Sequence, residues 1–340
     1  MGLKDAIRRA KEGRDIKPEL LPESEVVEEI IEESVEEKSL PVNEEDSSYG
    51  NFNESAIQKI IDNIDEIPTL PSIATLIMDK INNPMSDAKQ IAEIIKNDQS
   101  LTAKILKMSN SVYFKGYSDI TSIQTAIARL GIMNIRRMVL TVSVFDAFES
   151  LENYSFTLKD FWHHSIAVAT CARLIGERIG VQELEDLFTS GILHDIGKLI
   201  MVNHVEIMFG EVMDFIETNE TYSFYEAEKK LFNFSHCDIG SWLAVKWNMS
   251  RKIQNVIFRH HKPIIDTSTF TRDVLLFPCI INIADNLVKK HEIGFSGDKN
   301  YELDEEILNF VLGKHIELEP IEEKFLGEKE KMESLVEGMK

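Results

Sequence analysis

Apolar residues recur three and four positions apart from about residue 53 to residue 290, and this spacing limits the fold more than any other feature of the sequence. Residues at these intervals lie on one face of an α-helix, whereas a half-buried strand requires strict alternation. No sustained alternation occurs, and glycine and proline breaks are few. The pattern therefore predicts an all-α body.

Short helices with clear start and stop signals are expected in the first part of this body. Ser86 and Ser100 are suitable N-cap residues, Thr121-Ser122 opens a further helix, and Gly131 closes it. The predicted helices cover residues 56–64, 72–83, 87–97, 101–110, 123–131 and 135–148. Longer helices are then expected at 159–180, 184–202, 222–247, 251–261 and 272–290, with more after residue 302.

Composition excludes several classes of function. The chain of 340 residues carries a formal net charge of −21, which argues against a nucleic-acid surface because phosphate binding draws on Lys and Arg. No run of 18 or more apolar residues occurs, so no membrane span is expected. The three cysteines are too few for a disulfide framework, and the start lacks the apolar stretch of a signal peptide. These features indicate a cytoplasmic protein.

Much of the negative charge lies in an N-terminal segment. Residues 15–46 hold thirteen Asp or Glu against Lys17 and Lys38, with three prolines and no aromatic residue. This composition predicts a largely disordered acidic tail over residues 1–52. Within the tail, residues 24–38 carry apolar residues at helical spacing. They form either a transient helix or a helix that docks on a partner or on the body of this chain.

Histidine and aspartate side chains interrupt several of the predicted apolar helix faces. Asp285 falls on a stripe with Val274 and Ile281, and Asp195 lies in line with Phe188 and Leu199. A buried carboxylate without a partner costs several kcal/mol, so each must be paired or bound to a metal ion. Histidines recur in similar motif-like settings along the same stretch, and they add His164, His194, His236 and either His260 or His261 to the candidate metal ligands.

Each candidate has a simpler explanation when taken alone. A single histidine on an apolar face is usually a core residue that is hydrogen-bonded to a carbonyl group. Together, however, the candidates would need many separate partners, whereas one shared ion would satisfy them all. His and Asp ligands suit Fe, Mn or Zn alike, and a polar cluster without metal stays open. We assign no role to His204, His291 and His315, and interpret Cys237 and Cys279 as core cysteines.

Two sets of motifs resemble the HDOD domain, an output-domain relative of the HD phosphohydrolases. The first set consists of IPTLPSIATLIMDKINNP, IAEIIKNDQSLTAKILKMSNSVYF and ITSIQTAIARLG. The second set consists of HHSIAVA, GILHDIGKL, HCDIGSWLAVKW and the pair HH followed by AD. The resemblance spans roughly residues 63–290. One departure is Gln99, which stands where the family usually has proline.

The resemblance implies an all-α bundle of the HD type and two classes of function. HDOD domains are regarded as regulatory modules of bacterial-type signal transduction, often without demonstrated catalysis. Their HD relatives bind divalent ions and hydrolyse phosphoesters of nucleotides or cyclic dinucleotides. The resemblance implies that the metal ligands are His164, His194, Asp195, His236, His260, His261 and Asp285. In an active enzyme of this kind, Lys198 would contact a phosphate oxygen. The Gly-Tyr-Pro loop of the related HD-GYP phosphohydrolases is absent, because the sequence after the paired histidines is PIIDTSTFTRD.

The favoured expectation is a non-catalytic regulatory module that binds signalling proteins through its acidic tail or helical faces. The alternatives are a metal-dependent phosphohydrolase and a sensor that binds a nucleotide without hydrolysing it. The expected organisation is a tail (1–52), an N-terminal helical subdomain (53–150), an HD-like subdomain with the candidate site (151–292) and a C-terminal helical extension (293–340). Helices in the extension either pack on the body or form a homodimer contact, and the last residues are expected to fray.

Overall fold

All regular elements in the part of the chain that the structure describes are α-helices. The structure is a computed structural model, and it describes residues 70–82, 88–114, 118–148, 157–263, 265, 268–297, 299–313 and 316–339. Within these ranges the predicted all-α class is confirmed. The acidic tail and the helix predicted at 56–64 lie outside the described residues.

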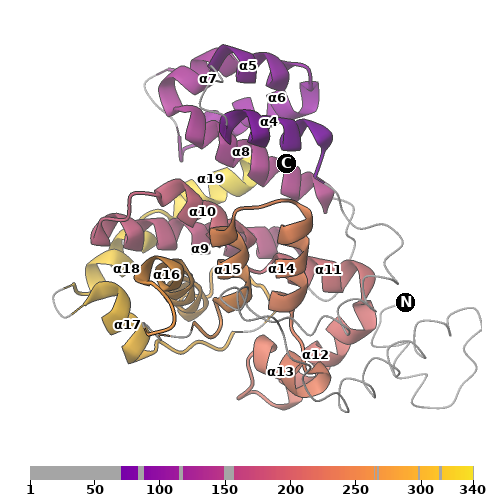
Figure 1. Cartoon of the computed structure of the whole chain (residues 1–340), viewed down its shortest axis with the longest axis vertical. Helices are drawn as coiled ribbons and strands as arrows, with labels where there is room; N and C mark the ends of the chain where they lie inside the picture. Colours follow the sequence, from indigo (N-terminus) through magenta and orange to yellow (C-terminus); the bar gives the residue numbers. More distant parts are fainter. Residues whose placement is uncertain are drawn as a thin grey trace, which may run out of the picture.

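The first described helices form one group at the top of Figure 1. Ser122 caps one of them as predicted, because its hydroxyl accepts a hydrogen bond from the Thr125 N–H at 3.1 Å. Asp98, and not Ser100, caps another, so that helix begins two residues earlier than expected. The group consists of α4 (Ser72–Asn82), α5 (Ala88–Lys96), α6 (Gln99–Ser109), α7 (Ile123–Leu130) and α8 (Ile132–Ala147).

Helix α9 (Leu158–Ile179) runs through the middle of the molecule in Figure 1. Helices α10 (Leu184–Leu193) and α16 (Arg272–Lys290) lie directly against it. The other helices of this part are α11 (Ile196–His204), α12 (Glu206–Thr218), α13 (Phe224–Phe232), α14 (His236–Lys246) and α15 (Arg251–Arg259).

Two of the predicted long helices are each interrupted by a turn. The helix expected at 184–202 breaks at His194 and Asp195, and the helix expected at 222–247 breaks between Phe232 and His236. The second break contains Asn233 with φ of +59°, a left-handed conformation that asparagine tolerates better than most residues. The first turn is buried, and in the second Phe234 and Ser235 are buried although Asn233 is exposed. The apolar pattern therefore largely continues through both turns, and periodicity does not reveal them.

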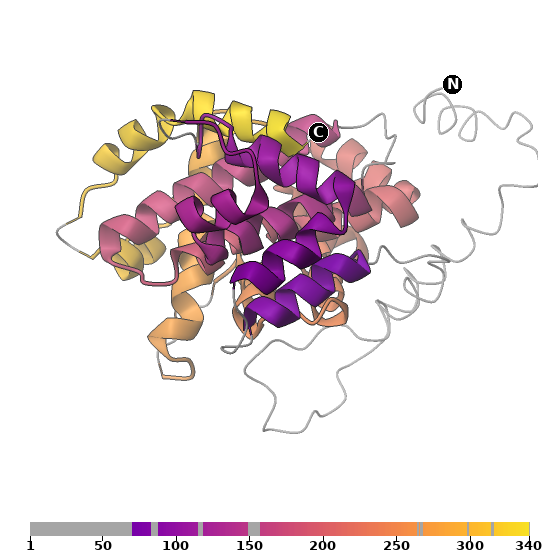
Figure 2. The ribbon, with the colours of Figure 1, turned by 90° about the horizontal axis from the view of Figure 1, so that it is seen from above.

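The C-terminal helices are α17 (Glu305–Leu312), α18 (Glu319–Leu326) and α19 (Lys329–Met339). Helix α19 packs on both α9 and α6, and Figures 1 and 2 show it beside the N-terminal group. The Ser334 hydroxyl accepts a hydrogen bond from the Val112 N–H at 2.9 Å, and the Met339 side chain is fully buried. The expected fraying is therefore wrong up to Met339, because this end of the chain is packed into the core.

No helix among the described residues is both long and apolar enough to cross a membrane.

Candidate metal centre

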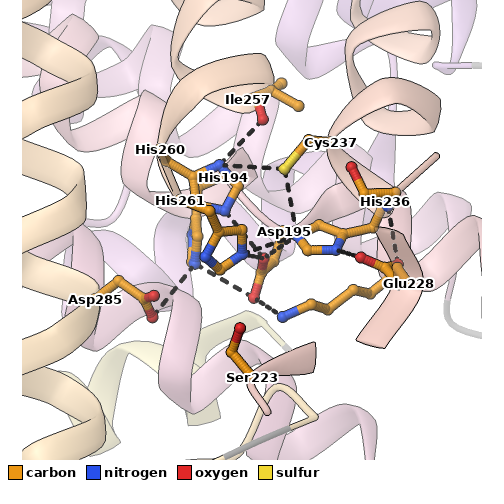
Figure 3. A network of polar contacts seen from close by, with 12 residues as sticks. His194, Asp195, Ser223, Glu228, His236, Cys237, Ile257, His260, His261 and Asp285 are labelled. Carbon is orange, nitrogen blue, oxygen red and sulfur yellow. Dashed lines mark hydrogen bonds and ion pairs between the residues drawn. The ribbon is translucent and has the colours of Figure 1, made fainter. Parts of the chain in front are cut away.

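The predicted ligands come together in one cluster, shown in Figure 3. They are contributed by α9, the α10–α11 turn, the start of α14, the end of α15 and the middle of α16. All are buried except His261, whose side chain is 11% exposed. The cluster consists of His164, His194, Asp195, His236, His260, His261 and Asp285.

Asp195 lies at the centre of the cluster. Its Oδ1 atom is 3.1 Å from His236 Nε2, 3.4 Å from His260 Nε2 and 3.9 Å from His261 Nε2. Its Oδ2 atom is 3.4 Å from His194 Nε2. Asp195 occupies the turn between α10 and α11, and its two oxygens lie close to histidines that belong to different helices.

Asp285 forms a second focus on the other side of the cluster. Its Oδ1 atom is 3.0 Å from His164 Nε2 and 3.9 Å from His194 Nε2. Its Oδ2 atom forms an ion pair with Lys289 Nζ at 3.1 Å, one turn along α16. His194 is therefore close to both carboxylates and connects the two halves of the cluster.

Several ligand-type atoms in this cluster have no hydrogen-bond partner although they are buried and close together. They are the Nε2 atoms of His164, His194 and His260 and the Oδ1 atoms of Asp195 and Asp285. The separations between these atoms are short, but none of the contacts has the geometry of a hydrogen bond. Each buried atom of this kind costs about 1–3 kcal/mol if it stays unpaired. Ligands held about 2.1 Å from one ion lie about 3.0–3.4 Å apart, depending on the coordination geometry, so the arrangement fits a divalent cation.

The outward-facing nitrogens of these histidines are fixed by hydrogen bonds. His194 Nδ1 lies 2.8 Å from the Gly191 carbonyl, and His260 Nδ1 lies 3.0 Å from the Ile257 carbonyl. His236 Nδ1 lies 2.6 Å from the Glu228 carboxylate. These contacts orient each ring so that Nε2 faces the cluster, as is typical of metal-binding histidines.

Glu228 belongs to the site although the sequence analysis does not select it. Its carboxylate is fully buried and also accepts a hydrogen bond from the His236 backbone N–H at 2.9 Å. A signal is present in the sequence, because Glu228 interrupts the buried face of α13 that Phe224 and Phe232 share. The argument that identifies Asp285 on α16 would find it.

Two glycines allow α11 and α14 to approach closely enough to join Asp195 with His236. A Cβ atom added at Gly197 would lie 1.9 Å from the His236 carbonyl oxygen. One added at Gly240 would lie 3.0 Å from the Gly197 nitrogen. Larger side chains at these positions would separate the two helices and therefore the two ligands.

Helix α15 is tied to α16 at a proline. Pro278 has no N–H to donate to the Val274 carbonyl one turn earlier. The side chain of Asn255 on α15 donates to that carbonyl instead, at 2.6 Å. Nearer the site, the Asn282 side chain donates to the His260 carbonyl at 2.7 Å. These contacts hold His260 and Asp285 at fixed relative positions.

The charges around the carboxylates favour their ionised forms. Burial alone would raise the pKa of Asp195, but Lys198 and His194 outweigh it and hold the pKa well below its usual range. Burial likewise opposes ionisation of Asp285, and Lys289 and His164 overcome it, so that pKa is also well below its usual range. Both carboxylates are therefore available as anionic ligands.

The histidines differ from one another in protonation. Burial, together with the charges of His260 and His236, lowers the pKa of His261 well below its usual value. Burial also acts to lower the pKa of His260, but Cys237 and Asp195 raise it to about 9. In the absence of metal, the cluster therefore holds protons on some rings and leaves others neutral.

Two cavities reach the cluster from outside. One of about 720 Å³ is bordered by His261 and Asp285, and one of about 510 Å³ is bordered by His164. Lys289 and Lys299 line both of them, and sequence reasoning does not select either residue. The larger cavity is also bordered by the acidic side chains of Glu226, Glu302, Asp304 and Glu306.

Lys198 lines neither cavity. It is fully buried, donates to Asp195 Oδ2 at 2.8 Å and lies 5.0 Å from the centre of the Phe224 ring. Among the histidines given no role, His204 lies at the end of α11, His291 pairs with Glu322, and His315 falls outside the described residues.

The comparisons with known proteins identify a domain family. The HDOD domain profile matches residues 67–263. A solved HDOD domain protein of unknown function from Geobacter sulfurreducens is similar, with a TM-score of 0.70, 25% identity and coverage of 84% of this chain and 97% of that protein. An uncharacterised protein of Treponema pallidum is 25% identical over 228 residues. That region is 64% of this chain and 44% of the relative, so the match spans less than half of that protein.

More distant solved structures share the fold. A protein of Marinobacter aquaeolei VT8, described as a candidate signal transduction protein, gives a TM-score of 0.68 at 16% identity and covers 93% of this chain and 65% of its own. A candidate phosphohydrolase of Shewanella amazonensis SB2B gives 0.65 at 22% identity and covers 83% and 98%. At these identities the likeness shows the fold alone. Because the family profile covers more than half of the sequence, the chain belongs to the HDOD domain family.

Proposed function

We propose that this chain is a regulatory HDOD module whose helical body is organised around a divalent metal centre. The observation that carries this proposal is the convergence of buried ligand atoms without hydrogen-bond partners. A site that had lost its metal-binding role would be expected to pair these atoms with one another or with the backbone. Here they are left facing shared space between helices.

The ligands divide into two sets around Asp195. His164, His194 and Asp285 lie on one side, and His236, His260 and His261 lie on the other. Asp195 is close to both sets, and its two carboxylate oxygens would be available as ligands to an ion held by either of them. Nitrogen and carboxylate ligands of this kind suit Fe, Mn or Zn.

The regulatory role is supported by the family and by the way the site is assembled. The Marinobacter aquaeolei protein, which shares the fold, is described as a candidate signal transduction protein. The ligands come from helices throughout α9–α16, so metal binding would stabilise their mutual arrangement. We propose that this arrangement, together with the acidic segment 1–52, presents a surface to signalling proteins.

Phosphoester hydrolysis is a second candidate, favoured by the cavity of about 720 Å³ that reaches His261 and Asp285. A bound divalent ion would supply an activated water and polarise a phosphoryl oxygen. Lys289 and Lys299, which line both cavities, would supply positive charge for a phosphate group. The fold is also shared with the candidate phosphohydrolase of Shewanella amazonensis SB2B.

Metal content measured by elemental mass spectrometry tests the first proposal. The protein should be purified without chelator or affinity tag, and should carry about one to two equivalents of Fe, Mn or Zn. Asp285→Asn should lose at least half of the bound metal, whereas Asp273→Asn, which changes an exposed residue of the same helix, should keep it. Less than a tenth of an equivalent, unchanged after incubation with each metal, would reject the metal centre.

Hydrolysis assays separate the two candidates. The metal-loaded protein would be assayed with bis(p-nitrophenyl) phosphate and with a panel of nucleotides and cyclic dinucleotides. Metal-dependent turnover that is lost in Asp285→Asn and kept in Asp273→Asn supports the enzyme. Full metal occupancy without turnover of any substrate supports the regulatory module.

A further inference from the structure

Cys237 is placed differently from the other cysteines. Cys171 and Cys279 belong to the contiguous cluster of buried apolar side chains, and Cys237 does not, although it is only 2% exposed. Its Sγ atom lies 3.6 Å from His236 Nε2 and 4.0 Å from His260 Nδ1. Figure 3 shows the sulfur beside these two rings. The interpretation of Cys237 as an ordinary core cysteine therefore does not describe its surroundings.

The backbone that carries Cys237 is held firmly. Ser235 and Asp238 form a reciprocal capping box at the start of α14, and the Ser235 N–H donates to Asp238 at 2.7 Å. The preceding residue, His236, is fixed through its backbone and its ring by Glu228. The position of the sulfur relative to the histidines is thus set by several independent contacts.

The separations match those around one tetrahedral ion. Zinc lies about 2.3 Å from sulfur and about 2.0–2.1 Å from nitrogen, which places ligand atoms about 3.6 Å apart for a sulfur–nitrogen pair. For two nitrogens the same geometry gives about 3.4 Å. The observed values are 3.6 Å for Cys237 Sγ to His236 Nε2 and 3.1 Å for His236 Nε2 to His261 Nε2. One ligand-type atom from each of His236, Cys237, His260 and His261 lies within 4.8 Å of the other three.

A second observation also indicates a bound ion at this place. His260 Nε2 is fully buried and has no hydrogen-bond partner, while its Nδ1 is occupied by the Ile257 carbonyl. Nε2 lies 3.4 Å from Asp195 Oδ1, which is also without a hydrogen-bond partner. Two buried ligand-type atoms beside His236 are therefore without a hydrogen-bond partner, as expected for ligands of an ion, and this observation does not depend on the cysteine.

We propose that the Cys237 thiolate is a ligand of the metal ion held by His236 and His261, so that this half of the centre is a sulfur-containing site. The inference rests on the proposed metal centre and goes beyond it by naming the class of metal. Soft thiolate ligands select zinc, and cobalt(II) as its spectroscopic substitute, over the harder manganese and magnesium ions. The other half, with His164, His194 and Asp285, offers only nitrogen and oxygen.

The two halves should therefore differ in metal preference. The half built on His164 and Asp285 accepts Fe, Mn or Zn, whereas the half built on His236 and Cys237 discriminates against Mn. Changes around a metal's ligands usually cost about 10- to 100-fold in affinity. Removing the thiol should weaken zinc binding more than manganese binding, so the preference for zinc over manganese should fall by about tenfold. The alternative is that Cys237 makes only a weak contact with the two imidazoles and never touches an ion.

Absorption spectroscopy of the cobalt(II)-substituted protein decides between these alternatives. Protein stripped with chelator is titrated with cobalt(II), and bound cobalt is counted by elemental analysis. A sulfur-to-cobalt charge-transfer band in the near ultraviolet is expected for the wild type. The band should vanish in Cys237→Ala, while visible cobalt bands from the nitrogen and oxygen ligands remain. The matched controls Cys171→Ala and Cys279→Ala should keep the charge-transfer band.

The outcomes separate the inference from the proposal beneath it. Bound cobalt with visible bands but no charge-transfer band in the wild type overturns the role of Cys237 and leaves the metal centre standing. Persistence of the band in Cys237→Ala has the same meaning. Failure to bind cobalt at all overturns both. If Cys237→Ala does not fold by circular dichroism, the wild-type spectrum and the two control variants still decide the question.

Discussion

Lys198 donates from the interior of the protein to Asp195 Oδ2 at 2.8 Å, and both side chains are buried. The two residues are three positions apart, at the point where α11 begins after the turn. Lys198 contacts only Oδ2 of Asp195, so Oδ1 stays near the histidines, and the Asp195 carboxylate compensates the charge of the lysine. Lys198 therefore holds the Asp195 carboxylate in position. Because Lys198 borders neither cavity, the phosphate contact that the family resemblance implies stays a prediction.

Removing Asp195 should destabilise the fold strongly. Asp195→Ala leaves the Lys198 charge buried without its partner, and breaking a buried pair in this way costs about 3–5 kcal/mol. The free energy of unfolding would be measured by urea denaturation in the presence of chelator. The control is Glu183→Ala, which breaks an exposed 3.0 Å pair with Lys252 and should cost at most about 1 kcal/mol. Equal effects of the two substitutions would contradict the buried pair.

Metal removal should lower thermal stability. A ligand that binds only the folded state stabilises it by about 2.7 kcal/mol at one hundred times its dissociation constant. We therefore expect the melting temperature to fall when chelator is added and to return when Zn or Mn is restored. Differential scanning fluorimetry measures this. Asp285→Asn should show a smaller response than the wild type to both additions, because it lacks one of the carboxylate ligands.

Metal binding should release protons. The pKa of His260 is raised to about 9, so its ring is protonated at neutral pH when no metal is present. A metal must displace that proton, and its affinity should rise about tenfold per pH unit for each proton displaced, until the pH reaches about 9. Calorimetry in buffers with different ionisation enthalpies counts the released protons. A binding enthalpy that is the same in all buffers would contradict this prediction.

The approach of α11 to α14 should not tolerate a larger residue. Gly197→Ala would place a Cβ atom 1.9 Å from the His236 carbonyl, and a backbone clash of this size requires the helices to move apart. We expect lower thermal stability and reduced metal content together. The control is Gly327→Ala, where the nearest atom lies at an ordinary 3.4 Å, and it should change the free energy of unfolding by less than about 0.5 kcal/mol.

Helix α19 should contribute measurably to the core. Leu335 is 1% exposed, and removing a buried leucine side chain costs about 2–5 kcal/mol in the free energy of unfolding. The matched control is Leu326→Ala on α18, where the side chain is 42% exposed and the loss should be much smaller. Chemical denaturation of both variants provides the comparison. A small effect of Leu335→Ala would mean that α19 separates readily from the body.

The ligand cluster is predictable from the sequence because its charged residues interrupt helix faces that are otherwise apolar. Asp195 and Asp285 interrupt apolar stripes, and a helix face tolerates a buried charge only when something compensates it. Glu228 could be found in the same way but lies on a short helix next to exposed charges. The sequence predicts Cys237 to be a core residue. Residue spacing indicates that a side chain is buried, but not whether apolar groups or imidazole rings surround it.

Helix boundaries are harder to predict than helix identity. Only Val205 separates α11 from α12, and no glycine, proline or polar loop marks that junction, so the sequence does not reveal α12. The turn at His194 and Asp195 is buried and lies within an apolar stretch, which periodicity interprets as one continuous helix. That break has a function, because it lets both side chains face the cluster where an unbroken helix would separate them by about 100°.

Pro278 has a consequence for how two neighbouring helices find their alignment. It leaves the Val274 carbonyl of α16 without an intrahelical donor, and the side chain of Asn255 donates to that carbonyl. Sliding α15 by one turn, about 5.4 Å, would separate the pair. It would also carry His260 away from Asp195. Apolar packing alone would permit α15 to lie at several positions along α16. The proline in α16 thus selects one of these positions.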